Sequence, residues 1–146
     1  MGMVSRAAVV WEGDLMSGKG TVSAVGSKAF GGLPVSWAAR TETPSGKTSP
    51  EELLASAHAS CFAMAFSAGL GRAKTPPTRL EVSCAVTFDK VGDGWKVKSS
   101  ALEVKGMVPG LDQAGFQAAA AAAKDGCPIS QALKGNVELS VTATLG

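Results

Sequence analysis

Residues 49–64 read Ser-Pro-Glu-Glu-Leu-Leu-Ala-Ser-Ala-His-Ala-Ser-Cys-Phe-Ala-Met. Ser49 can cap a helix, Pro50 suits the first helical position, and Glu52 completes a capping box. The following residues are apolar on nearly every side, which predicts a long helix buried by its neighbours and ending near Gly69 or Gly71. The interspersed histidine and serines, and the strong cap, argue against a membrane span.

On both sides of this helix, period-two alternation predicts short strands. They cover residues 7–12, 21–25, 35–38, 80–89, 95–104 and 137–143. A second helix is expected over residues 113–124, capped by Asp112 and stopped by Gly126, with a short helical turn at 129–133. Strands, helix, strand pair, helix and strand in this order indicate an α+β fold, and the length suits one domain over residues 1–146.

Composition excludes several classes of partner. The net charge is only +2 and aromatic residues make up 5% of the chain, so we expect neither nucleic acid nor an anionic membrane as a partner. The first residues lack a long apolar stretch, which predicts no signal peptide and a cytoplasmic protein. Three cysteines in such a protein favour redox or catalytic use over a structural disulfide framework.

Two of the cysteines occupy distinctive positions. Cys61 lies inside the long helix, and Cys127 follows the alanine-rich helix between Gly126 and Pro128. This arrangement suggests a thiol that reacts and a second thiol that resolves it, although both could be ordinary core residues. Cys84 alternates with valines on the apolar face of a strand and is interpreted as plain core.

A buried thiol needs a nearby cation to become a thiolate, because burial raises its pKa. His58 lies three residues before Cys61, and Arg40 offers a permanent charge with forked donors, with Glu51 to orient it. Each has a simpler interpretation: a satisfied core histidine, a solvated arginine, and a carboxylate matching the helix dipole. Glu51 lies roughly 15 Å along the helix from Cys61, so a shared site would take Glu51 from a second copy of the chain.

Several motifs together resemble the family of osmotically inducible protein C and the organic hydroperoxide resistance proteins. They lie at residues 11–14, 18–23, 49–53, 57–65, 108–110 and 124–131. The resemblance implies a thiol peroxidase acting on organic hydroperoxides, with Cys61 peroxidatic, Cys127 resolving, and Glu51 and Arg40 matching the family's glutamate and arginine. It also implies two antiparallel sheets around central buried helices in an intertwined homodimer.

We therefore expect a cysteine peroxidase that needs no metal or prosthetic group. Cys61 would reduce ROOH to ROH and become a sulfenic acid, Cys127 would condense with it to a disulfide, and an external dithiol, such as a lipoylated protein or a small thiol, would reduce that disulfide. We expect apolar walls that favour organic peroxides, formed by Leu54, Phe62, Met64 and Phe66. Two alternatives remain open: a Cys-His hydrolase using Cys61 and His58, and a non-catalytic dimeric stress or ligand-binding protein.

Overall fold

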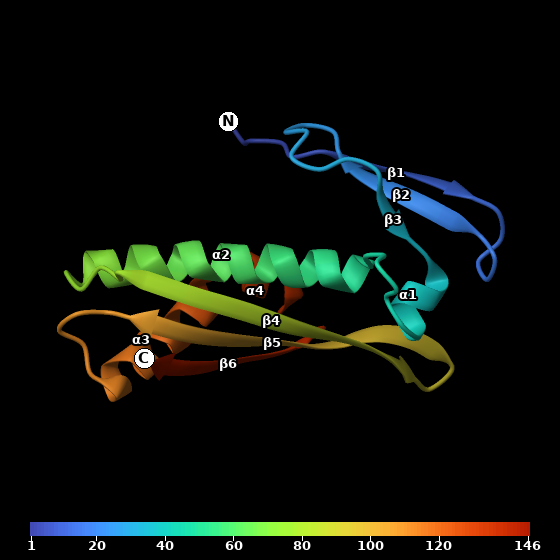
Figure 1. Cartoon of the computed structure of the whole chain (residues 1–146). Helices are drawn as coiled ribbons and strands as arrows, with labels where there is room; N and C mark the ends of the chain where they lie inside the picture. The colour runs from blue at the N-terminus through green and yellow to red at the C-terminus, as the bar shows by residue number, and fades with distance from the viewer. The chain divides into compact units, whose positions relative to one another are not determined.

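A computed structural model describes all residues from 1 to 146. The chain divides into two compact units, Met1–Pro50 and Glu51–Gly146, and each is described by itself (Figure 1). The single domain expected from length stays a prediction.

The first unit is a three-stranded antiparallel sheet followed by one short helix. Its strands β1 (Ala7–Glu12), β2 (Lys19–Ala24) and β3 (Leu33–Val35) lie in the order β1-β2-β3. The predicted hairpin of the first two strands is confirmed, with Trp11 opposite Gly20. A Cβ on residue 20 would lie 2.8 Å from the Trp11 ring, so the indole packs on a position that only glycine fills without a clash.

The strand predicted over residues 35–38 is wrong beyond its first residue. β3 ends at Val35, and residues Trp37–Thr41 form the helix α1. Ser36 caps this helix, because its hydroxyl accepts a hydrogen bond of 3.1 Å from the Ala39 N–H. Serine strongly favours such N-cap positions, and the cap overrides the strand preference of this segment. Arg40 therefore lies in the last turn of α1.

The second unit contains the long helix and a second three-stranded sheet. Its elements are α2 (Pro50–Arg72), β4 (Arg79–Val91), β5 (Gly94–Met107), α3 (Gln113–Gly126), α4 (Pro128–Leu133) and β6 (Glu138–Leu145). The α2 helix begins at the predicted proline, and Asp112 caps α3 by accepting a 2.7 Å hydrogen bond from the Gly115 N–H. Both predicted helices are confirmed.

The strand order in this sheet is β4-β5-β6, and one pairing differs from the expectation of antiparallel sheets. β4 and β5 form an antiparallel hairpin, whereas β5 and β6 run parallel. Parallel neighbours need a crossover connection, and α3 with α4 supplies it. The second sheet is therefore mixed, within the α+β class that the sequence indicates.

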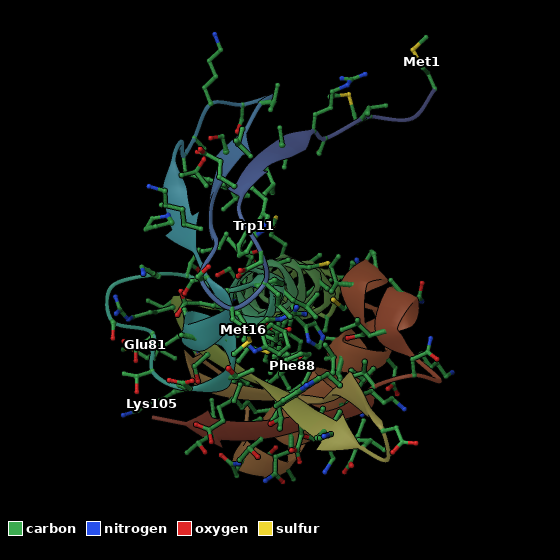
Figure 2. All side chains as sticks on the ribbon, turned by 90° about the vertical axis from the view of Figure 1, so that its right-hand side faces the viewer. Met1, Trp11, Met16, Glu81, Phe88 and Lys105 are labelled. Atoms are coloured by element: carbon green, nitrogen blue, oxygen red, sulfur yellow. The ribbon has the colours of Figure 1, made fainter.

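The core of the second unit lies between α2, α3 and one face of its sheet. Figure 1 shows α2 running along the sheet, and Figure 2 looks along the helix. The ring centre of Phe66 in α2 lies 5.1 Å from that of Phe116 in α3 and 5.4 Å from that of Phe62. The opposite face of the sheet is polar, with Glu81 opposite Lys105 across β4 and β5 (Figure 2).

The length and hydropathy of α2 would suffice to cross a membrane. Its side chains Phe62, Phe66 and Leu70 are instead buried in the core, each at most 1% exposed. The helix is thus packed in the core along one face, whereas the sequence predicts burial on nearly every side.

Candidate functional site

The second unit brings Cys61 and Cys127 together. Cys61 lies in the middle of α2 and is half-buried, whereas Cys127 is fully buried at the junction of α3 and α4. The backbone N–H of Cys127 closes α3 on the Ala123 carbonyl at 2.9 Å, and Pro128 starts α4. The two thiols share a hydrogen bond, which raises the pKa of Cys61 and lowers that of Cys127. The two cysteines selected from the sequence are thus neighbours in space.

The surroundings of Cys61 disfavour its thiolate. Burial raises the pKa of Cys61, and the hydrogen bond and charge of Cys127 raise it further. A hydrogen bond from the backbone of Ile129 acts in the opposite direction, but the pKa of Cys61 stays raised. Within this unit, the surroundings of Cys61 favour the protonated thiol, and a nearby cation would oppose that effect.

The surroundings of Cys127 lower the pKa of its thiol. Burial opposes the charge, but the pKa of Cys127 is lowered overall by hydrogen bonds from the backbone and hydroxyl of Ser130, from the Cys61 thiol and from the backbone of Ile129. These donors converge because the first turn of α4 follows Cys127 directly. The pKa values of the two neighbouring thiols are therefore shifted in opposite directions.

Arg40 and Glu51 belong to different units of the chain. Arg40 lies in the first unit, where its guanidinium is 5.8 Å from the centre of the Trp37 ring. Glu51 is buried in the first turn of α2. Their roles in activating Cys61 stay predictions.

His58 has two partners that the sequence did not reveal. Its Nδ1 lies 2.6 Å from the Ser100 hydroxyl of β5, and its Nε2 lies 2.7 Å from the Ser130 hydroxyl of α4. All three side chains are buried. One sequence signal points to this cluster: Ser100 shares its strand face with Leu102 and Val104, so its hydroxyl faces the core and needs a polar partner.

Cys84 is more than the plain core residue that alternation suggests. It is half-buried, and its sulfur lies 3.1 Å from the Ser100 hydroxyl and 3.8 Å from His58 Nδ1. Burial raises its pKa, which keeps the thiol protonated. Strand alternation correctly assigns its face but cannot reveal which polar side chains meet it there.

The predicted apolar walls need correction. Phe62 and Phe66 are completely buried, and Met64 is 69% exposed. The two phenylalanines are on the side of α2 that packs into the core, so they form no accessible wall. Of the expected set, Leu54 and Met64 keep some exposure.

Comparisons with known proteins agree with the fold and with the family resemblance of the sequence. Residues 43–142 match the family of OsmC-like proteins. The chain is 43% identical over 129 residues to the peroxiredoxin OsmC of Escherichia coli K12, covering 88% of this chain and 89% of that protein. It is also 30% identical over 96 residues to an organic hydroperoxide resistance protein of Xanthomonas axonopodis pv. citri, covering 65% and 66% of the two chains.

Solved structures show the same architecture. The organic hydroperoxide resistance protein OhrB of Bacillus subtilis superposes with a TM-score of 0.71 at 25% identity, covering 95% of this chain and 98% of that one. An OsmC-like protein of Mycoplasma pneumoniae superposes with a TM-score of 0.74 at 15% identity, covering 99% of each chain. With the match over residues 43–142 and the identity to the Escherichia coli protein, the chain belongs to the OsmC-like protein family.

Proposed function

We propose that this protein reduces organic hydroperoxides with Cys61 as the attacking thiolate and Cys127 as the resolving thiol. It is a cysteine-based peroxidase of hydroperoxide stress defence, in keeping with relatives named peroxiredoxin OsmC and organic hydroperoxide resistance protein. The observation that carries the assignment of residues is the hydrogen bond between the Cys61 and Cys127 thiols. Two cysteines this close can pass from thiols to a disulfide with little movement of the chain.

The chemistry balances without a cofactor. The Cys61 thiolate attacks one oxygen of ROOH, the O–O bond breaks, and the alkoxide takes up a proton to leave as ROH. Cys61 is then a sulfenic acid, and the Cys127 thiolate attacks its sulfur. The new S–S bond displaces hydroxide, which is protonated to water, and an external dithiol returns both thiols by exchange.

Arg40 is the proposed cation for Cys61, with Glu51 orienting it. The support for this role is that burial and Cys127 both raise the pKa of Cys61, so a cation is needed to stabilise its thiolate. A guanidinium near the sulfur would stabilise the thiolate and the alkoxide that develops during attack. Glu51 lies in the same helix as Cys61 but far along it, so the carboxylate of a second copy is the proposed partner of the site.

A homodimer also suits the first unit. Val9 and Val10 point to opposite faces of its sheet, yet they are 59% and 63% exposed, and Val22 is this unit's buried hydrophobic side chain at 6%. A three-stranded sheet with so little buried apolar surface needs cover on its faces. The proposed cover is a second copy of this chain, in a cytoplasmic protein that uses a lipoylated protein or a small thiol as reductant.

The hydrolase alternative is less well supported. A Cys-His hydrolase would need a nitrogen of His58 to take the proton of Cys61. Both ring nitrogens are already within 2.7 Å of serine hydroxyls. A peroxidase also uses Cys127, which a hydrolase leaves without a role.

The proposal is tested by measuring peroxide consumption. Purified protein is mixed with tert-butyl hydroperoxide and excess dithiothreitol, and the remaining peroxide is followed with time. Catalytic consumption that depends on the protein supports the assignment. Consumption no faster than with dithiothreitol alone would contradict it and favour a non-catalytic stress or ligand-binding protein.

A further inference from the structure

The core of the second unit contains a continuous relay of polar side chains. His58 of α2 bonds Ser100 of β5 through Nδ1 and Ser130 of α4 through Nε2, at 2.6 and 2.7 Å. The Ser130 hydroxyl bonds the Cys127 sulfur, and the Ser100 hydroxyl lies 3.1 Å from the Cys84 sulfur. The relay therefore runs from Cys127 to Cys84 through one imidazole and two hydroxyls.

The side chains of His58, Ser100 and Ser130 are buried, so the loss of any one of their hydrogen bonds should destabilise the fold. His58 and Ser100 are completely buried and Ser130 is 2% exposed. A buried polar group that loses its hydrogen-bond partner destabilises the folded state, because no water is at hand to replace that hydrogen bond. No buried side-chain nitrogen or oxygen lacks a hydrogen bond, so the loss of one hydroxyl would leave its neighbours unpaired.

The proton inventory limits how the relay can be arranged. A serine hydroxyl has one proton, and a neutral imidazole has one N–H. The hydroxyl of Ser130 lowers the pKa of Cys127, and the hydroxyl of Ser100 acts in the same direction on Cys84, against the effect of burial. Because a neutral His58 can donate to only one of the two serine oxygens, one serine can donate to its neighbouring sulfur while the other donates to the imidazole.

The two tautomers of His58 give two arrangements. With the proton on Nε2, the Ser130 hydroxyl can donate to Cys127; with the proton on Nδ1, the Ser100 hydroxyl can donate to Cys84. Burial raises the pKa of Cys84, whereas hydrogen bonds lower the pKa of Cys127 despite its burial, which favours the first arrangement. Burial also lowers the pKa of His58, which keeps the imidazole neutral.

We propose that His58 and Ser130 are positioning residues that hold the sulfur of Cys127 as a hydrogen-bonded thiolate aimed at Cys61, with Ser100 and Cys84 fixing the His58 tautomer. This role rests on the proposed function, because it acts in the step that forms the disulfide. There, the Cys127 thiolate attacks the sulfenic sulfur of Cys61, the S–O bond breaks, and the hydroxide leaves to the solvent, where the buffer protonates it to water. The relay gives up no proton in this step; its task is to keep the attacking sulfur deprotonated and in place.

The most direct variant is Ser130→Ala, which removes the hydroxyl between His58 and Cys127. It is compared with Ser130→Thr, which keeps a hydroxyl, and with Ser60→Ala on the exposed side of α2 as a matched control. Each is made in a Cys61→Ser background, and the alkylation rate of Cys127 by iodoacetamide is followed against pH with peptide-resolved mass spectrometry. The other titratable groups near Cys127 are His58 on α2, Cys84 on β4 and the Lys124–Asp125 pair at the end of α3, and all of them remain in these three serine variants.

We expect Ser130→Ala to move the alkylation profile of Cys127 to higher pH, while Ser130→Thr and Ser60→Ala leave it near that of the parent. With Cys61 present, disulfide formation after one equivalent of peroxide should slow about tenfold in Ser130→Ala, the size of one lost hydrogen bond to a charged acceptor. Formation of the Cys61 sulfenic acid, trapped with dimedone, should keep its rate. Ser100→Ala should move the Cys127 profile in the same direction by a smaller amount.

An unchanged Cys127 profile in folded Ser130→Ala would overturn the relay, even if the protein consumes peroxide normally. Conversely, a profile moved to higher pH in a protein that consumes no peroxide would leave the relay standing and remove the proposed function. Circular dichroism of each variant establishes folding. His58→Gln provides a second route to the same readout and should also move the profile upward.

Discussion

The Cys61 and Cys127 thiols share a hydrogen bond, although one cysteine lies inside α2 and the other between α3 and α4. Burial and this contact raise the pKa of Cys61, whereas hydrogen bonds lower the pKa of Cys127 despite its burial. Within the second unit, the proposed resolving thiol therefore gives up its proton more readily than the proposed nucleophile. The proposed role of Cys61 thus calls for an activating group from outside this pair.

Replacing Cys61 and replacing Cys127 should impair peroxide turnover in different ways. Cys61→Ser should abolish peroxide turnover, because no sulfur remains to attack the O–O bond. Cys127→Ser should allow about one turnover and then stop, since the sulfenic acid has no resolving partner and oxidises further. Pre-steady-state peroxide consumption separates the two results, with Ser60→Ala as the control. Repeated turnover by Cys61→Ser would remove Cys61 as the nucleophile.

Arg40 should set the pH at which Cys61 reacts. Burial and Cys127 raise the pKa of Cys61, so loss of a nearby cation raises it further and leaves less thiolate at neutral pH. Arg40→Ala should move the rising limb of the rate–pH profile to higher pH, and attack at neutral pH should slow roughly tenfold for each pH unit that the limb moves. Arg40→Lys should restore part of the rate, because it keeps the charge without the forked donors.

The matched control for this series is Arg72→Ala, which removes an exposed arginine at the end of α2. Its profile should overlay that of the unmodified protein. An Arg40→Ala profile that also overlays it would show that another group activates Cys61.

His58 should make stability depend on pH in mildly acidic solution. Burial lowers the folded-state pKa of His58 from its ordinary value of 6.5. Just below pH 6.5, His58 is therefore protonated in the unfolded chain but still neutral in the folded chain. The free energy of unfolding should therefore fall as pH drops below 6.5, by at most about 1.4 kcal/mol per pH unit. His58 is the sole histidine, which makes the assignment direct.

Urea unfolding at fixed protein concentration, from about pH 7 to about pH 5, measures this dependence. The His58→Gln variant should be less stable at neutral pH and lose most of the slope. A slope equal in both proteins would show that other groups cause it.

Glu51 should act across subunits. Glu51→Gln chains and Cys61→Ser chains, each impaired alone, should regain part of their activity when refolded together, because some mixed dimers then contain one site with both native residues. Mass spectrometry under native conditions checks that mixed dimers form. Mixed dimers with no more activity than the separate variants would refute a site shared between two copies.

The sequence predicted the helices well because their signals are local. Pro50 and Asp112 mark helix starts by capping chemistry, and both helices begin where these residues place them. The strand expected after Val35 is wrong because the Ser36 cap starts a helix there, and strand propensity over so few residues does not outweigh it. The parallel pairing of β5 and β6 could not be read from alternation, which specifies the face of a strand but not its direction.

The sequence predicts part of the site, because some of its residues carry local signals and others depend on tertiary contacts. Cys61 and Cys127 stood out through their positions on helices, and their proximity then followed from packing of α2 against the α3–α4 junction. The contacts of His58 with Ser100 and Ser130 join elements far apart in the chain. Such contacts depend on tertiary packing, so a single sequence suggests that His58 needs partners without naming them.

The most direct test of the proposed peroxidase is to identify the bond that one equivalent of organic hydroperoxide creates. Reduced protein, freed of thiol reagent, is treated with tert-butyl hydroperoxide, alkylated, digested without reduction and mapped by mass spectrometry. We predict a single disulfide between Cys61 and Cys127, with Cys84 recovered as the alkylated thiol. A product in which Cys61 remains a free thiol, or in which Cys127 is bonded to Cys84, would contradict the proposed division of roles between the cysteines.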